Sequence, residues 1–484
     1  MDNIYNLNFS QVKINEITKS TVDNLFALFK VQYFLNKVGI VKIRGHLTIT
    51  ILSVFFLFIF EKYRSVYEGI RLMDIGIYNT TLNNFLLNTK YDWRKLQISI
   101  VKHYTKKYSP DAGKECSLIA DDTSKKKTGR LVEFMSQFYD HSTGSYFTGH
   151  QVVFLGWYNG RSCVPLDFVI KTGKKRFKEA KRGIYDILSH TYKRYKESRL
   201  KKTDIVINMI KRAMKHNILF TYVLWDSWYN CDKAYKYIFT KLVPRGKHLV
   251  SMVKQSSEKY RYENNGQTED MPVNAIYKSI KKWQEMSNGI KFKSVTVGVT
   301  DKSKRKNRSI TGLVKMCFFW FPGQKKGKYK VIICTNLELT AEEIFEKYTQ
   351  RWSIEVMIKD IKQYMGYDQS KSSKYSALIA DLSIRCICYT MLCSLKEREP
   401  RKSIYQIVLE FNKSFEDHCF EVFTKYVIKR TITVLIDYMV SIGISLPKDI
   451  NLKLDEILLG FWNKDFHGDK IIETVDNGKK VRVA

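Results

Sequence analysis

Residues 116–122, CSLIADD, form a short apolar run that ends in two acids. Residues 220–226, FTYVLWD, repeat this pattern and end in Asp226. Short apolar runs that stop at polar residues are typical of strands in an α/β sheet. We therefore expect two strands that end in aspartates, at the sheet edge where crevices of α/β folds form.

The segments around these runs alternate between strand-like and helical patterns. Two strand-like stretches, 146–158 and 162–171, are joined by Asn159-Gly160, a strong β-hairpin pattern. A helical segment at 204–217 leads into the second apolar run, and a helix at 227–242 and a strand at 248–255 follow it. This order predicts an α/β fold with a mixed sheet.

The rest of the chain divides by its pattern. The segment IGIYNTTLNNFL, 75–86, is compatible with a helix-turn-helix reader capped at Thr80 or Thr81, or equally with a plain helical bundle. The predicted regions are a helical terminal-repeat DNA-binding domain at 1–108, a catalytic domain at 114–254 and 339–385, a β-rich insertion at 255–338, and a helical C-terminal region at 386–484.

The composition points to a polyanionic partner. The 484 residues include 82 Lys and Arg against 48 Asp and Glu, which gives a formal charge of +34. Each basic run taken alone is an ordinary solvated surface, but their sum favours nucleic acid.

Two other features bear on where the protein works. The run LTITILSVFFLFIF, 47–60, is shorter than the ~20 residues that cross a membrane, so it predicts a buried helix and no membrane partner. The first residues lack a signal-peptide pattern, and the nine cysteines show no zinc-ligand spacing, so we expect a cytoplasmic protein with reduced thiols.

The stretch YTQRWSIEVMIKDIK, 348–362, predicts a helix that follows a capping box at Thr340 and Glu343. At about 100° per residue, Tyr348, Arg351, Glu355 and Lys362 share an arc of roughly 60°. An ordinary surface helix with an Arg351–Glu355 pair would explain the pattern equally well.

The acids suggest a metal-dependent chemistry. Asp122, Asp226 and Glu355 would repel one another unless a cation neutralised them, and a carboxylate set without His or Cys suits Mg²⁺. Two such ions can support in-line phosphoryl transfer. A strand-ending aspartate is, however, often only a helix cap or turn former.

Tyr348-x2-Arg351-x3-Glu355-x6-Lys362 resembles the Y-R-E-K signature of the DDE transposases of insertion-sequence family four. IADDTS and VLWDSWY resemble the first and second acid motifs of that family. The resemblance runs from about residue 116 to 385, and it is weaker in the N-terminal region.

The resemblance implies an RNase H-like core in which Asp122, Asp226 and Glu355 hold two Mg²⁺ or Mn²⁺ ions. It implies that Arg351 and Lys362 grip phosphates of the transposon end, beside Tyr348. It also implies binding to terminal inverted repeats and target DNA by a homodimer in a synaptic complex. Trp320 would stack on a flipped base, although a core position would suit it equally.

We therefore expect a transposase that cleaves the ends of a mobile element and joins the 3′-hydroxyl to target DNA. Two alternatives are an RNase H-like nuclease without strand transfer and a DNA-binding derivative without catalysis. Within the doublet Asp121-Asp122, the D-T step of the motif selects Asp122, while strand alternation sends the two side chains to opposite faces.

Overall fold

The computed structural model describes residues 16–411 except 43, 73–75, 110–115, 130, 141–143, 174–184, 256–257, 265, 287–288, 301–308 and 324–327. Beyond 411 it describes a few positions and the strands β13 (Val475–Asp476) and β14 (Lys479–Lys480). The predicted C-terminal region therefore lies largely outside the described residues. Residues 17–412 form one compact unit, which is described below.

The first part of this unit is helical, as the sequence predicts. The helices bury aromatic side chains against one another, for example Phe26 edge-on to Phe56 with ring centroids 4.9 Å apart. Tyr78, rather than Thr80 or Thr81, precedes the short helix at 79–87, and it makes no side-chain cap. The helices are α1 (Glu16–Leu28), α2 (Val31–Val38), α3 (Thr48–Phe60), α4 (Val66–Leu72), α5 (Asn79–Leu87) and α6 (Trp93–Tyr108).

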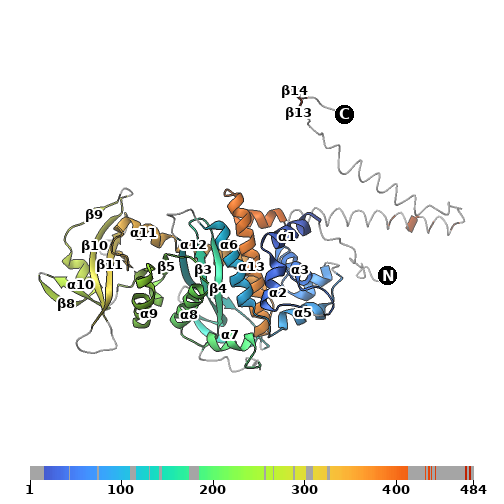
Figure 1. Ribbon diagram of the computed structural model, residues 1–484, viewed down its shortest axis with the longest axis horizontal. Coiled ribbons are helices and arrows are strands. Elements are labelled where there is room, and N and C mark those ends of the chain that lie inside the picture. Colours follow the sequence, from blue (N-terminus) through green and yellow to red (C-terminus); the bar gives the residue numbers. More distant parts are fainter. Residues whose placement is uncertain are drawn as a thin grey trace. The chain divides into compact units, whose positions relative to one another are not determined.

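Helix α13 (Tyr375–Arg398) is the central helix of the unit (Figure 1). It packs against α6, α3 and α5 on one side and against the sheet on the other. It is long and apolar enough to cross a membrane, but 89% of its apolar window is buried within the fold. Helix α3, the run that the sequence predicted as a buried helix, is also almost entirely buried. Both are core helices of this unit.

The strands up to residue 334 form one twelve-stranded mixed sheet in the described part of the chain. The order is β2-β3-β1-β5-β6-β12-β11-β10-β7-β8, with β4 beside β3 and β9 beside β10. Strands β1, β5 and β6 run parallel, and β3 and β4 run antiparallel to their neighbours. The bounds are β1 (Ser117–Lys126), β2 (Ser136–Asp140), β3 (Ser145–Tyr158), β4 (Cys163–Lys171), β5 (Tyr222–Trp225), β6 (His248–Val253), β7 (Lys259–Asn264), β8 (Gln267–Pro272), β9 (Gln284–Glu285), β10 (Lys291–Thr300), β11 (Ile310–Trp320) and β12 (Lys330–Cys334).

Two sequence expectations about the sheet can be compared directly. The Asn159-Gly160 hairpin joins β3 to β4, with Gly160 at φ 93°, a left-handed backbone that suits glycine. The strands expected within 255–338 are present, but they continue the central sheet through the β6–β12 pairing. The fold is therefore mixed α/β, as the sequence predicts.

Helices cover the two faces of the sheet at β1. A Cβ at Gly156 of β3 would lie 3.6 Å from the side chain of Ile354, so the helix that carries Ile354 packs closely on this face. The helix at 202–215 lies on the other face, against β3 and β4. The remaining helices and turns are α7 (His190–Ser198), α8 (Lys202–Lys215), η1 (Ser227–Tyr229), α9 (Asp232–Tyr237), η2 (Ile238–Leu242), η3 (Val243–Arg245), α10 (Val273–Ser279), α11 (Ala341–Thr349), α12 (Trp352–Gln363) and η4 (Tyr367–Gln369).

The stretch 348–362 is not the single regular helix that the sequence predicted. The capping box of Thr340 and Glu343 opens α11 as expected, but α11 ends at Thr349 and α12 begins at Trp352. The residues between them make tightened i→i−3 hydrogen bonds, such as Arg351 N to Tyr348 O at 3.0 Å. A tight helical turn therefore joins α11 to α12, and Arg351 immediately precedes α12.

Candidate active site

Asp226 follows the end of β5 as predicted, but Asp121 and Asp122 do not end their strand, because β1 continues to Lys126 beside β3. The two acid motifs instead meet where the parallel pairing of β1 with β5 ends. Ala120 of β1 is paired with Trp225 of β5, and the two strands are parallel. Asp121 is the next residue of β1, and Asp226 is the residue after β5. The two residues therefore lie at the same level along the two parallel strands. Carboxyl ends of neighbouring parallel strands form the edge at which α/β proteins bind ligands.

The two acids of the doublet lie on opposite faces of the sheet, as strand alternation requires. Asp121 accepts a hydrogen bond from Nη1 of Arg351 at 3.0 Å, on the face covered by α12. Asp122 accepts hydrogen bonds from Lys202 Nζ at 2.9 and 3.0 Å, on the face covered by α8. It is therefore Asp121, and not the predicted Asp122, that lies on the same face as Glu355.

Arg351 connects Asp121 to Glu355. Its Nη1 contacts Asp121 Oδ2 and its Nη2 donates to Glu355 Oε1. The Arg351 side chain is only 17% exposed, and Glu355 is 33% exposed. The expected Arg351–Glu355 pair is thus present, but it is a half-buried bridge to a strand and not an isolated pair on a helix surface.

The surroundings of Asp121 shift its pKa. Burial, and then the charges of Asp122 and Glu355, raise the pKa of Asp121 to about 6. The backbone N–H of Asp122 and the Arg351 charge act in the opposite direction. Asp121 therefore changes its protonation state close to neutral pH.

Tyr348 lies against the same cluster. Burial raises the pKa of Tyr348 to about 12, the Arg351 charge opposes the shift, and the charges of Asp226 and Asp121 add to it. Its hydroxyl is buried without a hydrogen bond of good geometry among the described residues, and the same holds for Arg351 Nε. Two donors beside the acids are therefore open to a further acceptor.

The contacts of Lys362 and Trp320 lie farther from Asp121, Arg351 and Glu355. Lys362 Nζ donates to Thr123 Oγ1 at 3.3 Å and to Ser124 O at 3.2 Å, along β1 beyond the doublet. Trp320 is the half-buried last residue of β11, paired with Lys291. The structure brings Lys362 to the strand of the acids, and no hydrogen bond or ion pair joins Trp320 to the acids among the described residues.

Three residues around Asp122 were not predicted from the sequence. Besides Lys202, Asp122 accepts hydrogen bonds from Gln151 Nε2 at 2.6 Å and from Tyr229 Oη at 3.2 Å. Tyr229 belongs to VLWDSWY, so the second acid motif could have identified it as a residue near the acids. Lys202 and Gln151 gave none, because only the packing of α8 and β3 against β1 brings them to Asp122.

The donor chemistry of the site suits a divalent metal ion. Within the residues that the structure describes, no three acidic, His or Cys side chains are close enough together to hold an ion. Arg351 instead neutralises Asp121 and Glu355. Oxygen donors alone are those that Mg²⁺ and Mn²⁺ prefer. A further cation would also offset the burial and the neighbouring charges that raise the pKa of Asp121.

A mixed sheet with acids where the parallel pairing of two strands ends, and a glutamate from a covering helix, is consistent with the RNase H-like class. Two family models match the chain in overlapping ranges. One, described as Transposase DDE domain, matches residues 177–391, and the other, described as DDE superfamily endonuclease, matches residues 49–268. No curated protein matches the chain.

These findings support a DDE transposase, that is, a transposase-type nuclease. The first match covers Asp226 and Glu355, and the second covers Asp121, Asp122 and Asp226. DDE domains generally use divalent metal ions, and a transposase domain implies DNA as the partner.

Proposed function

We propose that this protein is a DNA transposase of insertion-sequence family four that cleaves the ends of its element and joins the freed 3′-hydroxyl to target DNA. The observation that carries the proposal is the bridge from Asp121 through Arg351 to Glu355, at the level of the sheet where Asp226 follows the neighbouring parallel strand. Tyr348 of the Y-R-E-K residues lies against this bridge, and Lys362 contacts β1 beyond it.

In this proposal Asp121, rather than Asp122, acts with Asp226 and Glu355 as the acid set. Asp121 lies at the same level of the sheet as Asp226, and Arg351 bridges it to Glu355. Asp122 instead pairs with Lys202. These three carboxylates would hold two Mg²⁺ or Mn²⁺ ions. Such ions activate an attacking oxygen and stabilise the leaving oxygen of a phosphodiester.

Arg351, Tyr348 and Lys362 would hold the cleaved DNA end. The Nε of Arg351 and the hydroxyl of Tyr348 are buried without a partner among the described residues, and in this proposal each donates to a phosphate oxygen next to the acids when DNA is bound. Lys362, which contacts Thr123 and Ser124 of β1, would add a charge one step along the strand. Stacking of Trp320 on a flipped base stays a prediction of the resemblance alone.

The DNA partner is supported by the charge of +34, which many phosphate contacts would use. The partners in the proposal are the terminal inverted repeats and target DNA, bound by a homodimer in a synaptic complex. The flanking DNA of the gene, inspected for inverted repeats, supplies the terminal sequence for the assay.

A strand-transfer assay tests the proposal. The protein is incubated with Mg²⁺, a pre-cut terminal duplex and a supercoiled plasmid, and the products are separated on a denaturing gel. We expect a covalent product that joins the terminal 3′-end to the plasmid. A matched duplex with a 3′-deoxy end should give none, because the attacking hydroxyl is missing.

Two results would overturn the proposal. Cleavage of uncut ends without any joined product would instead favour a nuclease without strand transfer. Specific binding of terminal DNA without cleavage in either metal would favour a derivative that only binds DNA.

A further inference from the structure

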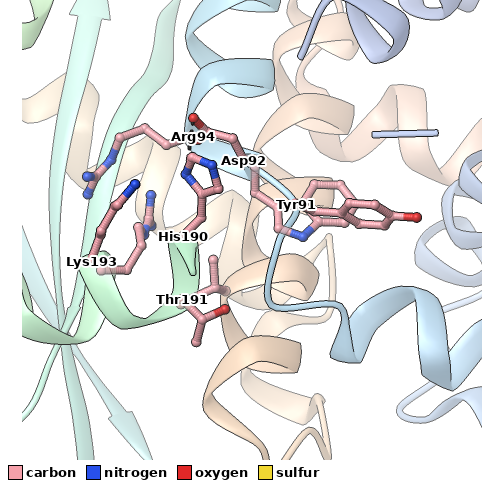
Figure 2. A pocket seen from close by; sticks show the side chains of 9 residues that line it. Tyr91, Asp92, Arg94, His190, Thr191 and Lys193 are labelled. Carbon is pink, nitrogen blue, oxygen red and sulfur yellow. Dashed lines mark ion pairs between the residues drawn. The ribbon is translucent and has the colours of Figure 1, made fainter. Parts of the chain in front are cut away.

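A cavity lies at the start of helices α6 and α7 (Figure 2). It has a volume of about 130 Å³, which is room for more than one water-sized group. None of the acids, nor Arg351 or Tyr348, lines it. Its polar lining is mainly basic and includes Arg94, His190, Lys193 and Arg194.

Behind this cavity lies a buried cluster with more arginines than acids, which we call the arginine cluster. Asp167 accepts from Arg94 Nε at 3.0 Å and from Arg212 Nε at 2.7 Å. Glu197 accepts from Nη2 of Arg94 at 2.6 Å and from Nη1 of Arg212 at 2.7 Å. The two acids are therefore fully engaged by two arginines.

Arg194 is the third arginine, and no carboxylate of the described residues pairs with it. Its side chain stacks over Phe168, 4.3 Å from the ring centroid, and its Nη2 donates to the Phe168 carbonyl at 3.0 Å. Its Nη1 is buried without a hydrogen-bond partner among the described residues, and the residue is 5% exposed. An unpaired buried cation is unfavourable unless an anion accompanies it.

The charge of Arg194 is retained at neutral pH. Burial, followed by the charge of Arg94, lowers the pKa of Arg194 to about 10, and Asp167 opposes this change. The group therefore cannot relieve the imbalance by losing its proton.

A second buried donor lines the same cavity. The indole Nε1 of Trp93 is buried without a partner among the described residues, and Trp93 is 3% exposed. An indole N–H can only donate, so its missing partner must be an acceptor. The two residues that carry these unsatisfied donors, Trp93 of α6 and Arg194 of α7, thus line one cavity.

The mouth of the cavity is suited to a ligand that arrives from solvent. Lys193 is exposed at the rim, and His190 lies 3.3 Å from the helix cap Asp92, which is the one acid of the lining (Figure 2). The N-termini of α6 and α7, helices of 16 and 9 residues, also meet here. Helix N-termini favour negative groups.

From this geometry we propose that the cavity is a binding site for one phosphate group, held by Arg194, Trp93 and Lys193. Arginine and an indole N–H would donate to phosphate oxygens, and Lys193 would add charge at the rim. The phosphate can be that of a DNA backbone or free inorganic phosphate. The inference does not depend on cleavage chemistry, because it involves none of the acids.

Thermal unfolding of the full chain in metal-free buffer tests the site. Inorganic phosphate is titrated at constant ionic strength, with chloride as the matched anion. We expect a saturable rise in Tm with phosphate and none with chloride, because only a ligand of the folded state stabilises it in this way. The Arg194→Met variant should lose the rise, while its Tm without phosphate should be no lower than that of the wild type.

A rim variant keeps the test valid if Arg194→Met does not fold. Lys193→Gln should raise the phosphate concentration for half-maximal stabilisation by about tenfold, as expected for the loss of one charged contact. Lys196→Gln, an exposed lysine on the same helix that does not line the cavity, should leave it unchanged.

A competition arm distinguishes the two sources of phosphate. If the cavity takes a backbone phosphate, inorganic phosphate at constant ionic strength should weaken binding of a short DNA duplex by the wild type and not by Lys193→Gln. Stabilisation by phosphate without competition would assign the site to the free ion. No phosphate-specific rise in Tm, or an equal rise in Lys193→Gln and Lys196→Gln, would overturn the proposal.

Discussion

The candidate active site and the arginine cluster are two half-buried charged regions with opposite imbalances. In the first, Asp121 and Glu355 share one guanidinium, that of Arg351. In the second, Arg94 and Arg212 share two carboxylates, and Arg194 is a third arginine without a carboxylate partner among the described residues. The leftover charge is negative in one region and positive in the other, so the first suits a cation and the second an anion.

The two regions also differ in how they tolerate their imbalance. A carboxyl can take up a proton, and the pKa of Asp121 is raised to about 6. A guanidinium keeps its proton at neutral pH, so the arginine cluster must find its counter-charge from outside. Local charge counts in buried regions therefore indicate the sign of a ligand, and the side-chain chemistry indicates how strongly that ligand is needed.

The largest expected effect separates the two aspartates of the doublet. Asp121→Asn should lower DNA cleavage by about 10³-fold or more, because a carboxylate of the reacting site is lost. Asp122→Asn should lower it much less, because Asp122 faces Lys202 on the other side of the sheet. Single-turnover cleavage with Mg²⁺ measures both, with DNA binding as the control for folding. A larger loss for Asp122→Asn would restore the original assignment of Asp122.

The next largest effect is the salt dependence of DNA binding, which follows from the excess positive charge of the whole chain. A formal charge of +34 predicts many phosphate contacts, so affinity for a duplex should fall by about 10³-fold between 50 and 200 mM salt. Fluorescence anisotropy over a salt series gives the slope of log affinity against log salt. A flat plot would remove DNA as the partner.

Removing one guanidinium from each region gives a direct contrast. Arg351→Met leaves Asp121 and Glu355 without their shared cation, so it should destabilise the metal-free protein by about 2 kcal/mol. Added Mg²⁺ should recover part of that loss. Arg194→Met should not destabilise the protein and should not respond to Mg²⁺. Thermal unfolding with and without Mg²⁺ measures the stability of both variants. An equal loss of stability and an equal response to Mg²⁺ in the two variants would contradict the predicted difference.

The smallest effect tests a buried acid that belongs to neither region. Asp360 of α12 accepts from Tyr389 Oη at 3.2 Å, and burial raises its pKa from the ordinary 3.8 to about 6, against the effect of that hydrogen bond. Because the folded-state pKa is raised, its contribution to stability is present below about pH 4 and is lost as pH rises through about 6.

Asp360→Asn removes this titration while it keeps an acceptor for Tyr389. Its free energy of unfolding, measured by denaturant titration, should equal that of the wild type at pH 4 and exceed it at pH 8 by an amount on the order of 2 kcal/mol. Lys359→Gln, the exposed neighbour, should show no such pH-dependent gain. A variant as stable as the wild type at both pH values would mean that Asp360 is not destabilised by burial.

Several features were predictable because they depend on neighbouring residues in the chain. The capping box at Thr340 and Glu343, the Asn159-Gly160 hairpin and the buried helix at 48–60 each appear in the structure. Arg351 and Glu355 are four residues apart, so any helical path brings them together. The tight turn at Gln350 was not predictable, because no Pro or Gly marks it.

The sequence by itself determined that two apolar strand segments are followed by acids, that one helix presents Arg351 with Glu355, and that the chain is strongly basic. It did not determine that β1 continues beyond its acids to Lys126, because that extension pairs with the distant strand β3. Only the tertiary structure decided which acid of the doublet faces Glu355, because alternation fixes opposite faces but not which helix covers each face. Only it also showed that the strands of 255–338 join the central sheet. The unpaired Arg194 likewise depends on where α6, α7 and α8 meet, since the partners of a buried charge come from distant segments.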